Sequence, residues 1–149
     1  MSERAVRNTA TKLLAQREHS RYELQSKLLF RNYDEVEIRQ VLDWLIYNDL
    51  QSDTRFAEAY TRMKMRRGFG SIRIRQELHD RGIEDELIER CLAIDLDEWA
   101  QEVIAVRRKK FGEPLPEDFE ESAKQMRFLQ YRGFTAEQIK HGMKQENGD

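Results

Sequence analysis

The segment from Arg66 to Ile83, RRGFGSIRIRQELHDRGI, combines closely spaced glycines with a row of arginines. Such a pattern could hold a phosphate group, because a glycine-rich turn exposes backbone N–H groups and arginine binds phosphate oxygens. A dinucleotide loop, however, needs a third glycine and a preceding strand, and a Walker loop needs a lysine followed by Ser or Thr. Neither pattern is present. We therefore predict that Gly68 ends a helix and that Gly70 permits a tight turn into the next one.

Residue types that serve catalysis or metal binding are scattered along the chain. The three histidines follow no metal-ligand spacing, and the carboxylates between Glu84 and Glu102 recur along expected helix surfaces without a pocket. The single cysteine, Cys91, cannot form an intramolecular disulfide, which is typical of a reducing compartment. We therefore predict no catalytic residues, no metal site and no cofactor, and we expect that the protein is not an enzyme.

Basic side chains are the strongest candidates for a binding surface. They gather in the middle of the sequence, where only Glu77 and Asp80 oppose them locally, and a second group follows later. Together they could form a ridge that meets nucleic-acid phosphates or a carboxylate-rich protein surface; a solvated charged face without a partner is the alternative. The residues of this predicted basic ridge are Arg62, Lys64, Arg66, Arg67, Arg73, Arg75, Lys109 and Lys110.

The composition favours an all-α protein. Only two prolines interrupt the 149 residues, and good helix formers such as Leu, Glu, Arg, Gln and Lys dominate. With 39% hydrophobic and 36% charged residues, the chain can bury a core beneath a densely ionic surface. The net charge of −2 argues against a uniformly basic nucleic-acid-binding protein. No apolar run could span a bilayer and no apolar signal region is evident, so we expect a cytoplasmic protein without a membrane partner.

One apolar pattern occurs three times, which predicts a tandem repeat. In each copy two amphipathic helices flank a short joint, and a further amphipathic helix precedes them. We therefore predict three-helix repeats at residues 1–48, 49–95 and 96–149, the third with a proline-containing insertion at 112–121. Each repeat is too small to bury its apolar face securely by itself. The recurring apolar positions are Leu28, Tyr33, Ile38 and Leu42, then Leu78, Ile83, Ile88 and Leu92, then Leu129, Phe134, Ile139 and Met143.

The joint of each repeat carries a helix-stop signal. An arginine is followed by Asn32, Gly82 or Gly133, and then by a large apolar residue. Asparagine and glycine accept the positive φ that often follows a helix, and the apolar residue can fold back onto the helix five positions earlier. Ser20 and Glu23 have the spacing of a capping box, and a second pair with this spacing opens the last expected helix. These signals predict where the helices of each repeat begin and end.

Four segments, in order and at the family's spacing, resemble the RecX family: DTRFAEAY at 53–60, RRGFGSIRIRQELHDRGI at 66–83, KKFGEPLP at 109–116 and RFLQYRGF at 127–134. The resemblance spans nearly the whole chain. It implies three repeats of three helices that form an elongated, curved helical array, in agreement with the periodicity. One departure is Asn32, which stands in the glycine position of the first joint at a modest conformational cost.

The resemblance also implies a function. A RecX-like protein is expected to bind RecA within the groove of the RecA filament on single-stranded DNA. It would inhibit strand exchange, ATP hydrolysis and co-protease activity, and thereby modulate homologous recombination, DNA repair and the SOS response. The basic ridge would then contact RecA or its DNA. We expect a monomer whose own binding to DNA is weak and nonspecific.

An alternative interpretation is a stand-alone DNA-binding protein, because three-helix units resemble helix-turn-helix modules. The net negative charge, and the absence of a helix with Arg, Asn and Gln at base-reading spacing, argue against it. A helical-repeat scaffold for an unrelated protein is a further alternative. Titration of single-stranded DNA with and without RecA separates the first two functions, because tight binding without RecA would support the stand-alone protein.

Overall fold

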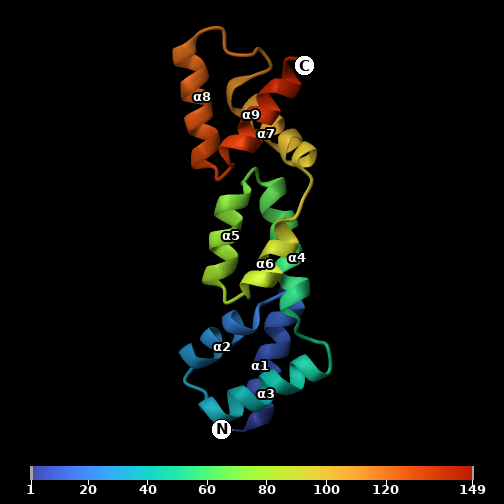
Figure 1. Cartoon of the computed structure of the whole chain (residues 1–149). Helices are drawn as coiled ribbons and strands as arrows, with labels where there is room; N and C mark the ends of the chain where they lie inside the picture. Colours follow the sequence, from blue (N-terminus) through green and yellow to red (C-terminus); the bar gives the residue numbers. More distant parts are fainter. Residues whose placement is uncertain (1, 149) are drawn as a thin grey trace. The chain divides into compact units, whose positions relative to one another are not determined.

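The structure, a computed structural model, describes residues 2–148, and every regular element within them is an α-helix (Figure 1). The prediction of an all-α protein is therefore confirmed. None of the helices in this range is long and apolar enough to cross a membrane. In chain order the helices of residues 2–148 are α1 (Glu3–Gln16), α2 (Arg21–Phe30), α3 (Glu35–Tyr47), α4 (Asp53–Arg66), α5 (Ser71–Asp80), α6 (Asp85–Leu92), α7 (Leu96–Phe111), α8 (Phe119–Tyr131) and α9 (Ala136–Glu146).

Helix starts follow local side-chain chemistry. The Ser20 hydroxyl accepts a hydrogen bond from the Glu23 backbone N–H, and the Glu23 carboxylate accepts one from the Ser20 N–H. The predicted capping box therefore opens α2, and Thr135 with Gln138 forms the same box at the start of α9. Asp34 accepts hydrogen bonds from two backbone N–H groups in the first turn of α3. Each cap satisfies donors that a helix start leaves unpaired, at a gain of about 1 kcal/mol.

The three repeated helix ends share one geometry. Asn32, Gly82 and Gly133 have φ angles of 63°, 78° and 100°, in the left-handed region. The next residue donates its N–H to the carbonyl five positions earlier, as in the 3.1 Å bond from Ile83 to Leu78. This arrangement satisfies carbonyls that the end of a helix would leave unpaired. The helices α2, α5 and α8 therefore end in the same way.

The chain forms two compact units. The first comprises the residues up to Tyr60 together with Leu78–Ile88, and the second comprises Thr61–Glu77 together with the residues from Glu89 onward. The three middle helices, α4 to α6, thus contribute residues to both units. Because this division by contacts does not follow the sequence repeats, the repeat boundaries stay a prediction.

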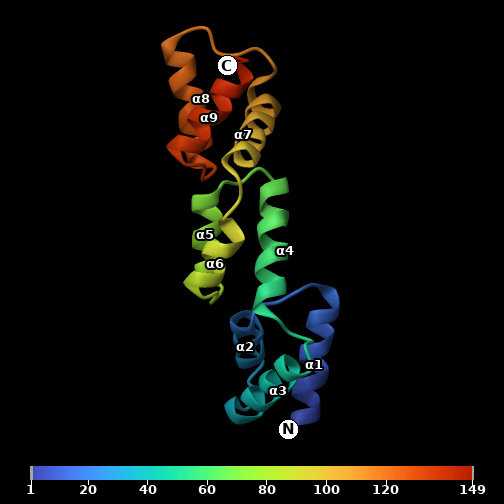
Figure 2. The same ribbon diagram turned by 45° about the vertical axis from the view of Figure 1, so that its right-hand side comes forward.

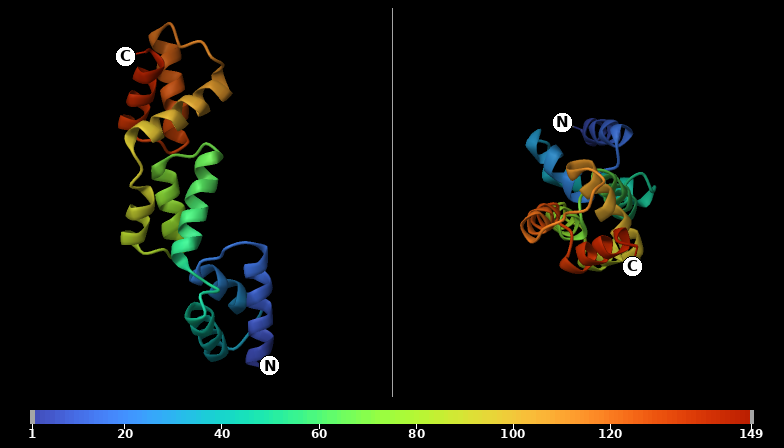
Figure 3. Two further views of the ribbon diagram at one scale, coloured as in Figure 1. Left: turned by 90° about the vertical axis from the view of Figure 1, so that its right-hand side faces the viewer. Right: turned by 90° about the horizontal axis from the view of Figure 1, so that it is seen from above.

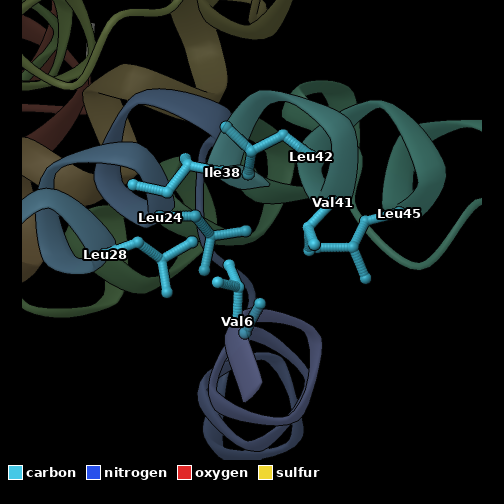
Figure 4. Close-up of a cluster of buried hydrophobic side chains, with 8 residues drawn as sticks. Val6, Leu24, Leu28, Ile38, Val41, Leu42 and Leu45 are labelled. Atoms are coloured by element: carbon cyan, nitrogen blue, oxygen red, sulfur yellow. The ribbon is translucent and has the colours of Figure 1, made fainter. Parts of the chain in front are cut away.

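The core of the first unit lies between α1, α2 and α3, drawn from blue to teal in Figure 3. Leu24 and Leu28 of α2 lie beside Val6 of α1 and Ile38 of α3, and all four are buried (Figure 4). Burying one such side chain contributes about 1.5–3 kcal/mol, so this cluster outweighs any single surface contact. The full cluster is Val6, Ala10, Leu24, Leu28, Ile38, Val41, Leu42 and Leu45.

In the second unit α7 packs closely against α9 (Figure 2). A Cβ atom on Gly142 would come within 2.8 Å of Val103 Cγ1, so glycine at this position permits the close approach of the two helices. Trp99 of α7 and Phe134 meet edge to face, with their ring centroids 6.4 Å apart. The core of this unit therefore joins the last helix of the chain to α7.

A buried arginine fastens three parts of the second unit together. Arg107 of α7 is completely buried, and its guanidinium donates hydrogen bonds to both carboxylate oxygens of Glu146 at 2.6 and 2.8 Å. It also donates to the carbonyls of Glu113 and Pro114 and to the side-chain oxygen of Gln125. Because the charge has a bidentate partner and further acceptors, its burial is compensated. Arg107 thereby ties α8, α9 and the proline-containing loop to α7.

The proline-containing loop ends earlier than the sequence indicates. The insertion was expected at 112–121, but α8 begins at Phe119, and Asp118 caps it by accepting a hydrogen bond from the Glu121 N–H at 2.8 Å. The sequence pattern misses this helix start because acidic residues favour both an exposed loop and the first turn of a helix. The last three residues of the expected insertion therefore belong to α8.

Candidate functional site

The predicted basic ridge separates into a group paired with carboxylates and a group that lines a groove, while Arg62 is exposed outside that groove. In the first group, Lys64 and Arg73 both form ion pairs with Glu77, at 3.0 and 2.9 Å. Arg75 donates two hydrogen bonds to the Glu89 carboxylate at 2.8 and 3.0 Å, and this interaction raises the pKa of Arg75. Three of the expected binding cations therefore have carboxylate partners within the second unit.

The ring of Phe69, in the turn between α4 and α5, gathers cations around it. Lys64 Nζ lies 4.3 Å from the ring centroid, and the Cζ atoms of Arg73 and Arg132 lie 4.2 and 3.9 Å from it. A cation near an aromatic face is attracted to the ring quadrupole by about 0.5–1 kcal/mol at an exposed site. Phe69 and Glu77 therefore together offset the repulsion among these three cations.

Arg132, which follows α8, reaches the C-terminal end of α4. Its Nε donates to the Gly68 carbonyl at 3.0 Å, and a terminal nitrogen donates to the Arg67 carbonyl at 2.5 Å. The Arg132 carbonyl in turn accepts a hydrogen bond from the Gly70 N–H at 2.9 Å. A cation at these carbonyls also complements the negative end of the helix dipole. The α4–α5 turn and the α8–α9 joint are thus connected by both backbone and side-chain bonds.

Position 70 requires glycine because a Cβ atom has no room there, and not because of the φ angle. A Cβ atom on Gly70 would overlap the backbone of the α8–α9 joint, and one on Gly133 would lie 2.6 Å from Arg73 Cβ. Gly68, in contrast, ends α4 with a φ of 85°, a conformation that glycine adopts without strain. Gly70 therefore permits a close contact inside the second unit, and Gly68 permits the end of α4.

A groove of about 470 Å³ lies beside this contact. Its lining comes from the C-terminal ends of α4 and α8, the residues that directly follow them, and α7 from Glu102 to Lys110. Four members of the predicted basic ridge line the groove and Arg132 joins them, whereas Arg62, Lys64, Arg73 and Arg75 are not part of the lining. The charged residues of this cationic groove are Arg66, Arg67, Lys109, Lys110 and Arg132, with one carboxylate, Glu102.

Positive charge exceeds negative charge in the cationic groove. Arg66, Arg67, Lys109 and Lys110 are exposed, and none of them forms an ion pair with a carboxylate of residues 2–148. The lining has five cations. Glu102 and three helix C-termini of roughly half a negative charge each oppose them, which leaves an excess of about 2.5 positive charges. The groove therefore attracts anions.

The corresponding joint of the first unit has different electrostatics. There the Ser20 hydroxyl donates to the Arg81 carbonyl at 2.8 Å, and Arg81 Nε lies 3.7 Å from the Glu23 carboxylate. Arg81 occupies the same position of the repeat as Arg132. The arginine of the first unit thus has a carboxylate partner, whereas Arg132 donates to backbone carbonyls.

Side chains suited to metal binding do not converge in residues 2–148, where no group of three or more His, Cys, Asp or Glu residues could hold an ion. His19 is buried in the first unit and interacts with Lys27. His141 in the second unit lies 2.6 Å from Asp97. Each of these two histidines thus contacts neighbouring side chains in its own unit.

Comparison with known proteins identifies the family. Models described as the first, second and third three-helix domains of RecX match residues 7–45, 52–92 and 97–142. The regulatory protein RecX of Halorhodospira halophila is 43% identical over 136 residues, which cover 91% of this chain and 84% of that protein. The chain belongs to the RecX family. Its three three-helix domains are those of RecX.

Further RecX proteins agree with this assignment. The regulatory protein RecX of Chromohalobacter salexigens is 40% identical, over 95% of this chain and 92% of that protein. The crystal structure of RecX from Lactobacillus salivarius superposes with a TM-score of 0.83, covering 99% of this chain and 97% of that one at 21% identity. At that identity the structural likeness supports the fold alone.

The predicted basic ridge of this RecX-family chain missed one cation of the groove, Arg132. Its only sequence signal is the repeated triplet of arginine, glycine and a large apolar residue, which indicates a helix end. The triplet does not indicate which carbonyls the arginine reaches, because Arg132 and its acceptor Arg67 lie 65 residues apart. Only the packing of α8 near α4 identifies it.

Proposed function

We propose that this RecX-family protein binds RecA and the RecA filament on single-stranded DNA, and that it inhibits the recombinase, ATPase and co-protease activities of RecA. Such inhibition would modulate DNA repair, homologous recombination and the SOS response in the cytoplasm. The observation that carries the proposal is the similarity to proteins named regulatory protein RecX over 91% and 95% of the chain. In this role the protein acts by binding and is not an enzyme.

Several small domains suit a polymeric partner. A filament presents the same surface on every protomer, so different three-helix domains of one monomer can contact different protomers. Once one domain is bound, the others act at a high effective concentration, and the overall affinity can exceed that of one contact by about 10²- to 10⁴-fold. Modest surface patches are therefore sufficient for regulation.

The cationic groove is the surface we propose for contact with the filament. Its four exposed cations, Arg66, Arg67, Lys109 and Lys110, have no carboxylate partner among residues 2–148. Arg75, in contrast, would have to release Glu89 before it could bind another anion. Charge alone does not select the binding residues; the availability of each cation does.

The test is the ATPase activity of RecA on single-stranded DNA as purified protein is added. We expect inhibition, accompanied by loss of strand exchange and of co-protease activity. Inhibition far below one molecule per RecA protomer would indicate an effect on filament growth, and stoichiometric inhibition would indicate occupancy along the filament. If RecA retained all three activities at a molar excess of the protein, the proposed function would be wrong.

A further inference from the structure

We propose that the cationic groove of the second unit binds a short stretch of single-stranded nucleic acid, with phosphates on its cations and one base against Phe128. The inference deepens the proposed function, on which it rests only for the choice of DNA as the nucleic acid. Proteins that bind single strands without sequence preference combine a cationic groove for the backbone with an aromatic side chain on which a base stacks. Both features line this groove.

The cations available for phosphates come from two helix ends. Arg66 and Arg67 lie at the end of α4, and Lys109 and Lys110 lie in the last turn of α7. All four are exposed and none is paired with a carboxylate of residues 2–148, so a ligand does not have to break an existing ion pair to reach them. Arg132 contributes differently, because its hydrogen bond to the Arg67 carbonyl holds the end of α4 beside the groove. It is a positioning residue for the other cations.

The aromatic side chain that lines the groove is the partly exposed Phe128 of α8. Phe111 contacts this ring edge to face, with centroids 5.5 Å apart and an interplanar angle of 88°, which restrains the orientation of Phe128. Lys110 Nζ lies 5.4 Å from the centroid of Phe128, so the aromatic surface directly adjoins a phosphate-binding cation. Ala105 and Val106 add small apolar side chains to the lining.

This combination favours a single strand over a duplex. The bases of a duplex are already stacked and paired, so an aromatic ring in a groove gains little from them, whereas an unpaired base can stack on it. The volume of about 470 Å³ is that of a small-ligand site and accommodates a nucleotide-sized portion of a strand. So small a contact predicts weak, salt-sensitive binding, with a Kd of about 1–100 µM.

Glu102 is the one lining residue that opposes a phosphate. Burial and then the charge of Glu98 raise the pKa of Glu102. The carboxylate forms no ion pair with the cations beside it, so its removal would not disturb them. We expect Glu102→Gln to strengthen oligonucleotide binding by about two- to fivefold, because one repulsive charge next to the phosphates disappears.

The experiment measures fluorescence anisotropy of a labelled oligo-dT of about 12 nucleotides, titrated with the full chain near 50 mM salt and without RecA. We expect the double variant Lys109→Ala/Lys110→Ala to bind at least about tenfold more weakly. The slope of log Kd against log salt should fall by about 1.4, since each phosphate contact of a single strand contributes about 0.7.

The matched control is Lys124→Ala/Arg127→Ala. It removes the same charge from exposed positions on α8 that lie among acidic residues and outside the groove. We expect this control to change the Kd by less than about twofold, because long-range effects of surface charges are largely screened by salt. Equal losses in the two double variants would overturn the proposal, because binding would then follow net charge and not the groove.

Two further experiments test whether a base stacks on Phe128. Phe128→Leu keeps an apolar side chain but removes the stacking surface, so we expect at least about fivefold weaker binding of oligo-dT. Inorganic polyphosphate, which has phosphates but no bases, should compete poorly. Equal competition by polyphosphate or by duplex DNA of the same length, or unchanged affinity of Phe128→Leu, would overturn the assignment to single strands.

The outcome is independent of the RecA assay. If oligo-dT binding fails but the ATPase of RecA is still inhibited, the groove is not a nucleic-acid site and the proposed function stands. If the oligonucleotide binds as predicted but RecA is unaffected, the groove site stands and the proposed function is wrong.

Discussion

At the scale of single residues, the glycines of the joints matter for two separable reasons. Gly133 combines a φ of 100° with a position where a Cβ atom would lie 2.6 Å from Arg73 Cβ. Asn32 also has a positive φ, of 63°, but its side chain is exposed. Asparagine is tolerated in the first joint because this site imposes only the backbone requirement.

This difference predicts unequal costs of alanine at the two positions. We expect Asn32→Ala to lower the free energy of unfolding by about 1 kcal/mol, from left-handed strain alone. Gly133→Ala should cost about 2–4 kcal/mol, because steric overlap adds to the strain. Urea unfolding of both variants measures the difference. Equal costs would show that the contact with Arg73 relaxes freely.

His19 makes the stability of the first unit depend on pH. Its Nε2 lies 2.8 Å from Lys27 Nζ and its Nδ1 lies 3.0 Å from the Arg17 carbonyl, which fits a neutral ring that accepts from the lysine and donates to the carbonyl. Burial lowers the pKa of His19 below its ordinary 6.5. The charges of Arg17 and Lys27 lower it further, whereas the hydrogen bond with the Arg17 carbonyl raises it.

The sign of the pH effect follows from this lowered pKa. The unfolded chain binds a proton at His19 more readily than the folded chain, so stability is complete above about pH 6.5 and falls as the pH drops through the folded pKa. An NMR titration of the His19 ring, together with urea unfolding at pH 7.5 and about 5.5, measures it. A His19 that titrates at or above its ordinary pKa would contradict the prediction. Lys27→Met should move the pKa upward.

At the scale of elements, Glu146 links the last helix to α7. Burial opposes its ionisation, but hydrogen bonds from Arg107 and Arg108 prevail and hold the pKa of Glu146 below its ordinary value. We expect Glu146→Gln to lower the free energy of unfolding by about 3 kcal/mol, because Arg107 is left buried with an uncompensated charge. The control Arg108→Ala removes the half-exposed partner and should cost less than about 1 kcal/mol.

Acidification should mimic this substitution. Because the folded pKa of Glu146 is lowered, its contribution is present above the ordinary value of 4.5 and is lost as the pH falls through the folded pKa. Urea unfolding between about pH 6 and 3 should therefore show a shallower loss of stability in Glu146→Gln than in the unsubstituted protein. Parallel curves would mean that Glu146 is not ionised in the folded state at neutral pH.

At the scale of the whole molecule, regulation of RecA should depend on which cations are available. We expect that at least about tenfold more of the Arg66→Ala/Arg67→Ala variant is needed for half-maximal inhibition of the RecA ATPase. The reason is that each charge-assisted contact contributes up to about 1.5–3 kcal/mol. Arg73→Ala/Arg75→Ala removes the same charge, but its arginines are paired with Glu77 and Glu89. This control should stay within about threefold, and a larger loss there than in the groove would contradict the role of the groove.

The sequence by itself determined the helical class, the three repeats and the helix ends at Asn32, Gly68, Gly82 and Gly133. These features depend on side chains within about five positions of one another, as in the capping box of Ser20 and Glu23 or the bond from Ile83 to Leu78. The start of α8 at Phe119 has no comparable local signal, because its acidic residues suit an exposed loop and a first helical turn equally well.

Only the tertiary structure decided which basic side chains remain available. Arg75 looks like Arg66 in the sequence, yet Glu89, 14 residues away, pairs with Arg75, while Arg66 lines a groove with Lys109 and Lys110. Arg132 lies in the same groove because it donates a hydrogen bond to the Arg67 carbonyl, which is far away in the chain. The physical reason is that helix propensity and capping are local, whereas the partner of a charge depends on which helix surfaces packing brings within a few ångströms.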